Sequence, residues 1–111
     1  MGRKKIYDTK RIPKSVQAIS RAICADYARR KKELPSITDE AVRASYVRMN
    51  EAVDAALLSL EEGPIREVIG RDILSRRGYE MSTAREIISV GAYYARRRQV
   101  LRLVAEELAL I

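Results

Sequence analysis

The stretch from Ser89 to Glu107, SVGAYYARRRQVLRLVAEE, determines the fold class that this 111-residue chain is expected to adopt. Two tyrosines and three consecutive arginines lead into apolar residues spaced three and four apart, which is the period of an α-helix. The same periodicity dominates the chain from Pro13 onward, and no segment sustains the two-residue alternation typical of a half-buried strand. The sequence therefore predicts an all-α protein, a small helical bundle of about five helices.

Proline, glycine and capping residues predict where the other helices begin and end. The expected segments are a helix over about 14–33 that follows Pro13, a second that begins after its cap Thr38 and runs to about Glu62, a third near 64–77 that stops at Gly78, and a short fourth capped by Ser82. The first is expected to bury Val16, Ile19, Ile23 and Tyr27, and the second Val42, Tyr46, Met49, Val53, Leu57 and Leu60. Residues 1–63 would form a basic arm plus two helices and residues 64–111 a helix-turn-helix unit, within one compact domain overall.

The chain is strongly basic, and its charge is unevenly distributed. Lysine and arginine number 22 against 15 aspartate and glutamate residues, which gives a net charge of +7. Residues 1–35 carry +8, residues 36–64 carry −4 and residues 65–111 carry +3. Because most of the basic residues are arginines, whose guanidinium groups match phosphate geometry, this distribution favours nucleic acid as a partner for the two cationic ends.

Several classes of function are excluded or disfavoured by residue content. The sequence has no histidine, which excludes Ser-His and Cys-His catalytic pairs and any zinc site that contains histidine. Its five glycines match no phosphate-loop or dinucleotide-binding spacing. No apolar run approaches the roughly 18 residues of a membrane span, and the basic N-terminus is not followed by an apolar signal region. We therefore expect a cytoplasmic protein without catalytic activity, cofactor, metal or membrane association.

The C-terminal half has the element order of a DNA-reading motif. Two short helices, a break around Ile87–Ala92 and a longer final helix with basic first turns make the order of a helix-turn-helix. In that motif the second helix enters the major groove of DNA.

The segment from Ile88 to Ile111, ISVGAYYARRRQVLRLVAEELALI, resembles the C-terminal half of phage transcriptional regulators of the RinA/ArpU type. Those proteins resemble the promoter-reading helix-turn-helix of sigma factors. The residues that fit are Ile88, Ser89, Tyr93, Tyr94, Arg97, Arg98, Val100, Leu101, Leu103, Val104, Ala105, Leu108, Leu110 and Ile111. The resemblance weakens over 64–87 and reduces to charge and helix layout over 1–63.

The resemblance implies a role for each part of the final helix. Ser89 would cap the recognition helix and Tyr93 would be a core residue beneath its first turn. Tyr94, Arg97 and Arg98 would face the DNA or its phosphates. The residues that would anchor the helix to the bundle are Val100, Leu101, Val104, Ala105 and Leu108.

The first turn of the final helix departs from that family. Val90, Gly91 and Ala92 stand where polar or basic side chains are common, and they offer only methyl contact or close backbone approach. Direct contact with base edges would then fall to Tyr94, Arg96, Arg98 or Gln99, and Arg102 completes the candidate set on this helix. Two registers remain open at this point: a helix capped by Ser89, or a turn over 90–92 with the helix starting at Tyr93.

The N-terminal residues are expected to supplement the helix as a basic arm that adds phosphate contacts. The residues of this arm are Arg3, Lys4, Lys5, Lys10 and Arg11. The expected function is regulation of phage or prophage transcription by binding double-stranded DNA. Two alternatives are a DNA-packaging protein similar to a terminase small subunit, which would form a homo-oligomeric ring, and a module that binds an acidic protein such as RNA polymerase.

Overall fold

The computed structural model describes residues 12–111, and the described residues are helical with no strand among them, which confirms the all-α prediction. The basic arm residues Arg3, Lys4, Lys5, Lys10 and Arg11 lie outside the described residues. In chain order the elements are α1 (Lys14–Ala25), α2 (Tyr27–Glu33), the 3₁₀ helix η1 (Leu34–Ser36), α3 (Glu40–Leu58), α4 (Pro64–Ser75), the 3₁₀ helices η2 (Tyr79–Met81) and η3 (Thr83–Glu86), and α5 (Val90–Glu107).

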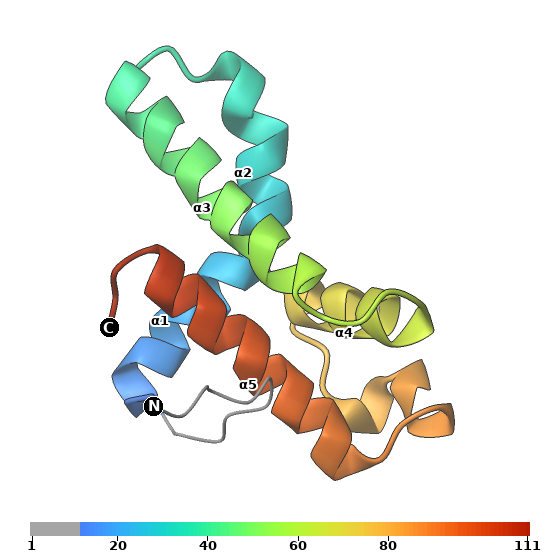
Figure 1. Cartoon of the computed structure of the whole chain (residues 1–111). Helices are drawn as coiled ribbons and strands as arrows, with labels where there is room; N and C mark the ends of the chain where they lie inside the picture. The colour runs from blue at the N-terminus through green and yellow to red at the C-terminus, as the bar shows by residue number, and fades with distance from the viewer. Residues whose placement is uncertain (1–11) are drawn as a thin grey trace.

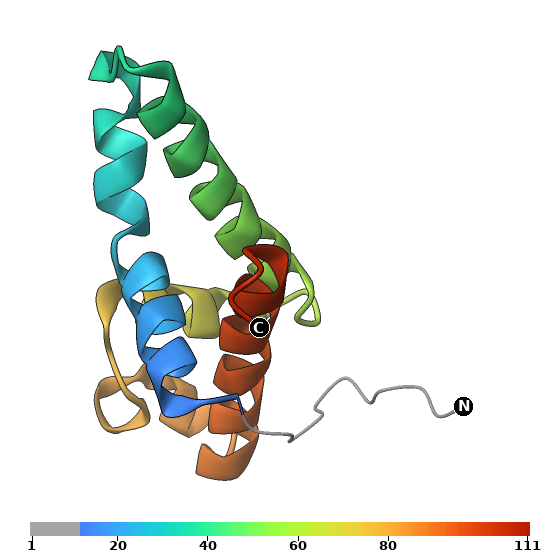
Figure 2. The same cartoon turned by 90° about the vertical axis from the view of Figure 1, so that its left-hand side faces the viewer.

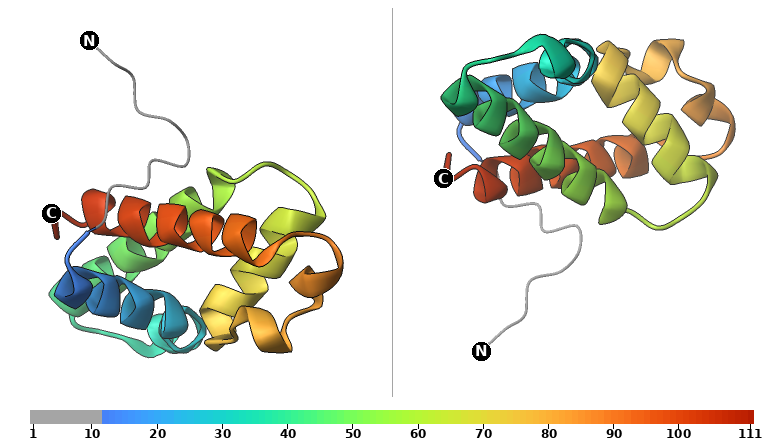
Figure 3. Two further views of the ribbon diagram at one scale, coloured as in Figure 1. Left: turned by 90° about the horizontal axis from the view of Figure 1, so that it is seen from below. Right: turned by 90° about the horizontal axis from the view of Figure 1, so that it is seen from above.

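The final helix is the centre of the packing. Figures 1 and 2 show α2 and α3 as a hairpin that projects from the rest of the molecule. The second half of α3, α1 and α4 all contact α5. In Figure 3, α1 and α4 lie along one side of α5 while α3 crosses it on another. Because α5 is surrounded in this way, its orientation depends on helices from both halves of the chain.

One hydrophobic core joins these helices. Its buried members are Cys24, Val53, Ala56, Leu60, Val68, Ile69, Ile73, Ala84, Tyr93, Val100, Leu101 and Val104. Val100, Leu101, Val104 and Ala105 are all buried, as expected for the face that anchors α5, and Leu108 packs against the core from its edge. The core takes side chains from both 1–63 and 64–111, so the two stretches share one interior.

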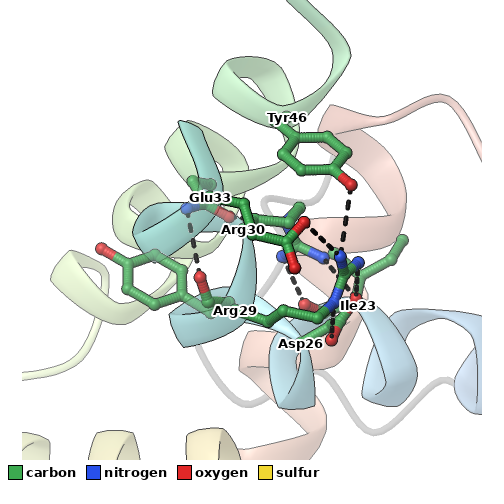
Figure 4. Close-up of polar contacts among 8 residues, drawn as sticks. Ile23, Asp26, Arg29, Arg30, Glu33 and Tyr46 are labelled. Carbon is green, nitrogen blue, oxygen red and sulfur yellow. Dashed lines mark hydrogen bonds and ion pairs between the residues drawn. The ribbon is translucent and has the colours of Figure 1, made fainter. Parts of the chain in front are cut away.

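The first helix is not continuous over 14–33 as the sequence predicts, because it breaks at Asp26. The guanidinium group of Arg30 is buried at this break (Figure 4). Its Nη2 donates to the carbonyl oxygen of Ile23, and its Nε donates to Asn50 Oδ1 at 2.7 Å. These acceptors come from α1 and α3, so the break is stabilised by a tertiary contact that no local sequence signal reveals.

The buried face of α1 also differs from the predicted stripe. Ile19 is 47% exposed, whereas Ser20 and Cys24 are fully buried. The hydroxyl of Ser20 donates to the carbonyl oxygen of Leu101 at 2.6 Å. A small residue at this position lets α1 approach the backbone of α5 closely, and this rotation of the helix carries Ile19 outward.

The cap and end of α3 also need correction. Asp39, not Thr38, caps the helix, since its Oδ1 accepts the backbone N–H of Val42 at 3.0 Å. The helix ends at Leu58 rather than near Glu62. Val42 is 41% exposed near the tip of the hairpin, so the stripe predicted for this helix is buried only in its second half.

The segment between α4 and α5 is less helical than the sequence predicts. Ser82 acts as a cap, because its Oγ accepts the backbone N–H of Ala84 at 2.9 Å. The helix that it begins is one 3₁₀ turn, Thr83–Glu86, rather than a short α-helix. α4 ends at Ser75, where Arg76 adopts a left-handed conformation with φ of 62°. The element before α5 is therefore a compact turn.

Candidate nucleic-acid interface

The start of α5 settles the two registers that the sequence left open. Ser89 has an extended backbone, and its Oγ accepts the backbone N–H of Ala92 at 3.2 Å. The helix therefore begins at Val90, not at Tyr93. With this register, residues 94, 97, 98 and 101 share one face of the helix.

Three tyrosines hold the preceding segment against the first turns of α5. Tyr93 is fully buried, as expected, and its ring lies edge-on to those of Tyr79 and Tyr94 at centroid distances of 5.1 and 5.0 Å. The hydroxyl of Tyr79 donates to the carbonyl oxygen of Ile88 at 2.8 Å, and the backbone N–H of Tyr79 donates to Tyr94 Oη at 3.2 Å. Tyr94 thus contributes a half-exposed ring whose hydroxyl is already anchored.

A groove with a basic lining lies between α1 and the N-terminal half of α5. It has a volume of about 330 Å³ and is lined by Gln17, Arg21, Tyr94, Arg97, Arg98 and Leu101. Arg21 and Arg98 are exposed, and Arg97 is partly buried. Among the described residues that line this α1–α5 groove there are three guanidinium groups and no carboxylate. The groove therefore has the electrostatic character of an anion-binding surface.

Arg97 is the most constrained of the three arginines. Its Nη1 donates to the carbonyl oxygen of Arg77 at 2.6 Å and to Tyr93 Oη at 3.0 Å. Its guanidinium carbon lies 5.5 Å from the ring centroid of Tyr93 and 5.9 Å from that of Tyr94, which is cation–π range. The side chain is therefore held in one place at the edge of the groove.

Tyr93 continues this chain of hydrogen bonds into the core. Its hydroxyl donates to Oδ2 of the fully buried Asp72 at 2.7 Å. Burial, reinforced by the hydrogen bond to Asp72, raises the pKa of Tyr93 to about 12, against the opposing effect of Arg97. The tyrosine is consequently a neutral donor at physiological pH.

Two residues of the predicted set point away from the groove. Arg96 donates to both carboxylate oxygens of Glu61, with Nη2 and Oε2 2.9 Å apart, and its side chain is 14% exposed. Gln99 is 9% exposed, and its Nε2 donates to Ser59 Oγ at 2.9 Å. Both face the end of α3, because a helix advances about 100° per residue and positions 96 and 99 lie opposite 94, 97 and 98. In the structure both side chains therefore contact the end of α3 and do not line the groove, and their contact with base edges stays a prediction.

Arg102 lies one turn beyond Arg98 and does not line the groove. Its Nε donates to Glu106 Oε2 at 3.1 Å, and its side chain is 14% exposed. The ion pair compensates part of its charge, so Arg102 contributes less to the positive potential than the groove arginines do.

Two groove residues, Gln17 and Arg21, were absent from the predicted set. Lys14, Gln17 and Arg21 are spaced i, i+3 and i+7 along α1, so the sequence did contain a polar stripe on one helix face. The sequence does not show that this face of α1 lies beside α5, because that placement depends on the buried contact of Ser20 with Leu101.

No family model, curated protein or solved structure matches this chain. Within residues 12–111, no helix is both long and apolar enough to cross a membrane. Over the same described range, no cluster of three or more candidate metal ligands occurs.

Proposed function

We propose that this protein is a non-catalytic, cytoplasmic regulator of phage or prophage transcription that binds double-stranded DNA through the α1–α5 groove. The observation that carries the proposal is the convergence of Arg21, Arg97 and Arg98 on one groove without a lining carboxylate. Guanidinium groups bind phosphate oxygens in a bidentate manner, and release of condensed counterions from DNA adds to the affinity. The net charge of +7 acts in the same direction.

The shape of the groove indicates which part of the duplex it would contact. Its arginines lie in a recess between two helices, not on the crest of a protruding helix. A recess accepts the ridge formed by a sugar–phosphate strand, whereas base edges lie at the floor of a DNA groove and require a protruding element. We therefore assign Arg21, Arg97 and Arg98 to phosphate contacts.

Base contacts would then come from the first turn of α5. Val90 is 51% exposed, and Gly91 is exposed beside it. Apolar side chains and bare backbone make methyl contacts with thymine, so discrimination between sequences would be modest. The resemblance to phage regulators supports the same assignment of α5 to the DNA, and the basic residues at positions 3, 4, 5, 10 and 11 would add phosphate contacts beside it.

The decisive experiment is titration of a labelled duplex with the protein over a range of salt concentrations. Each neutralised phosphate contributes about 0.9 to the slope of log affinity against log salt, so four to six contacts predict a slope of about −4 to −5. Arg98→Ala should weaken binding and make the slope shallower by about 0.9, the contribution of one phosphate contact. Arg48→Ala, which removes an exposed arginine of α3 outside the groove lining, is the matched control for net charge and should have little effect.

Other outcomes would replace the proposal. Absence of duplex binding at low salt would exclude it and favour a module that binds an acidic protein such as RNA polymerase. Equal effects of Arg98→Ala and Arg48→Ala would mean that the groove is not the interface. Binding accompanied by assembly into a closed ring in analytical ultracentrifugation would favour a packaging protein similar to a terminase small subunit.

A further inference from the structure

Asp72 places a carboxylate in the hydrophobic core, where an apolar side chain would be expected. The residue is fully buried on α4. Its Oδ2 accepts the hydroxyl of Tyr93 at 2.7 Å, and its Oδ1 has no hydrogen-bond partner in the described structure. Burial of an incompletely paired carboxylate is costly, so packing alone does not account for an aspartate at this position.

Both hydrogen bonds that fix Arg97 lead back to Asp72. The first runs from Arg97 Nη1 to Tyr93 Oη and from Tyr93 Oη to the Asp72 carboxylate. The second runs from Arg97 Nη1 to the carbonyl oxygen of Arg77, whose own backbone N–H donates to the carbonyl oxygen of Asp72 at 2.8 Å. The side chain of Asp72 thus holds the hydroxyl of Tyr93 in place. The backbone of Asp72 closes the turn that presents the carbonyl oxygen of Arg77.

We propose that Asp72 is a positioning residue which, acting through the hydroxyl of Tyr93, holds the guanidinium group of Arg97 at the edge of the α1–α5 groove in the orientation that meets a DNA phosphate. The inference rests on the proposed function and adds to it a polar chain that begins in the core and ends at the DNA. A guanidinium group that is already immobilised loses less conformational entropy when it binds, so Asp72 and Tyr93 raise the affinity of Arg97 for DNA without contacting DNA themselves.

The electrostatics of the three groups fit this role. Tyr93 keeps its proton at neutral pH, since burial raises its pKa to about 12. Its hydroxyl can therefore donate to Asp72 and accept from Arg97 at the same time. The neutral tyrosine thereby links the side chain of Asp72 to that of Arg97 through two hydrogen bonds.

The chain contains a matched control for the loss of a tyrosine hydroxyl. Tyr27 donates to Asp54 Oδ1 at 2.7 Å, the same distance as between Tyr93 and Asp72. This second pair joins α2 to α3, in the projecting hairpin, and neither residue lines the α1–α5 groove. Tyr27→Phe therefore removes a tyrosine–aspartate hydrogen bond of the same length, at a more exposed position, without touching Arg97.

The experiment compares Tyr93→Phe and Tyr27→Phe by two measurements on the full chain. Nitrogen-15 relaxation of the Arg97 Nε–H group reports directly whether the guanidinium group is held. Titration of a labelled duplex reports affinity and its salt dependence. We expect Tyr93→Phe to make the Arg97 side chain mobile and to weaken duplex binding about five- to tenfold, while Tyr27→Phe changes neither.

A conservative variant separates positioning from core stability. Asp72→Asn keeps an oxygen that can accept from Tyr93, so it should retain an ordered Arg97 and most of the affinity, whereas Asp72→Ala should lose both. Folding of each variant is checked by urea denaturation, and the Asn–Ala comparison still tests the proposal if Tyr93→Phe fails to fold.

The outcomes distinguish failure of the inference from failure of the proposed function. If Arg97 stays ordered in Tyr93→Phe, or becomes mobile without loss of affinity, Asp72 and Tyr93 do not position it for DNA. If the wild-type protein does not bind duplex DNA at low salt, the proposed function fails, and the DNA role inferred for Asp72 fails with it. In that case the relaxation measurement still establishes whether Tyr93 holds Arg97.

Discussion

Ser20 of α1 donates its hydroxyl proton to the carbonyl oxygen of Leu101 in α5 at 2.6 Å, although 81 positions separate the two residues in the chain. This bond sets α1 alongside α5 at the point where the α1–α5 groove closes, because Leu101 also lines the groove. The geometry of the candidate DNA interface thus depends on a buried serine that touches no solvent.

The first prediction concerns this contact. Ser20→Ala should lower the free energy of unfolding by about 0.5–1.5 kcal/mol, the usual net contribution of one hydrogen bond. Ser20→Leu should cost more, about 1–3 kcal/mol or above, because the larger side chain must push α1 away from α5. Urea denaturation measures both. Ala18→Leu, an exposed position on the same helix, is the control for added bulk and should be nearly neutral.

The second prediction separates the packed face of α5 from its groove face. Leu101 is 5% exposed, so Leu101→Ala should cost about 2–5 kcal/mol of stability through lost burial and the cavity that remains. Arg98 is exposed, and Arg98→Ala should leave stability within about 0.5 kcal/mol. If urea melts instead showed a larger loss of stability for Arg98→Ala than for Leu101→Ala, the face of α5 that carries Arg98 would be the packed one.

The features that the sequence predicted well are those set by local chemistry. The cap at Ser82 follows from its side-chain oxygen, and the cap at Ser89 was one of the two registers that the sequence left open. The buried face of α5 is the one that the resemblance implied, and its apolar residues follow helical spacing. These interactions form within a few residues, so a pattern along the chain carries the information.

The features that the sequence missed are set by contacts between distant segments. The break at Asp26 is stabilised by Arg30, whose Nε donates to Asn50 on α3, 20 positions away. Gln99 turns inward because Ser59 of a different segment accepts its amide, and Arg96 because Glu61 does. A run of arginines predicts charge, but which of them faces solvent depends on partners that only the tertiary structure supplies.

A third prediction uses two glycines with opposite backbone requirements. Gly91 lies in the first turn of α5, and a Cβ atom added there would meet nothing within 4 Å. Gly91→Ala should therefore raise the free energy of unfolding by up to about 1 kcal/mol, since alanine is the better helix former. Gly63 has φ of 127°, so Gly63→Ala should be destabilising despite equally open space. If thermal melts ranked the two substitutions the other way, Gly63 would not require a positive φ and Gly91 would not lie in a regular helical turn.

The fourth prediction is the stability of the fold at alkaline pH. Burial raises the pKa of the Cys24 thiol to about 11, and that of Tyr93 to about 12, above the values of 9.0 and 10.0 expected when the chain is unfolded. Both groups are protonated in the stable fold, so their contribution is complete below pH 9 and is lost as the pH rises through 11 and 12. Urea melts between pH 8 and 11.5 should show falling stability.

Single substitutions identify the groups responsible for this loss of stability at alkaline pH. Cys24→Ala should remove the part of the decline that begins near pH 9, and Tyr93→Phe the part that begins near pH 10. Each variant serves as the control for the other. A decline of unchanged shape in both variants would assign the loss to other groups.

The last prediction distinguishes what the N-terminal arm, the groove and the first turn of α5 each contribute to DNA affinity and to sequence discrimination. The arm and the groove both offer basic side chains suited to phosphate, which carries no sequence information by itself. Deleting residues 1–11, or replacing Arg98 by alanine, should therefore weaken binding to every duplex by similar factors and make the salt slope shallower. Replacing the exposed Val90 by serine should instead leave the salt slope unchanged, because this substitution removes no charge. Since the proposal assigns base contacts to the first turn of α5, Val90→Ser should also narrow the difference in affinity between a duplex selected from a random pool and its scrambled version. Titrating the variants against both duplexes measures these effects. If Arg98→Ala removes discrimination while Val90→Ser retains it, the groove reads bases and the assignment of phosphate and base contacts must be reversed.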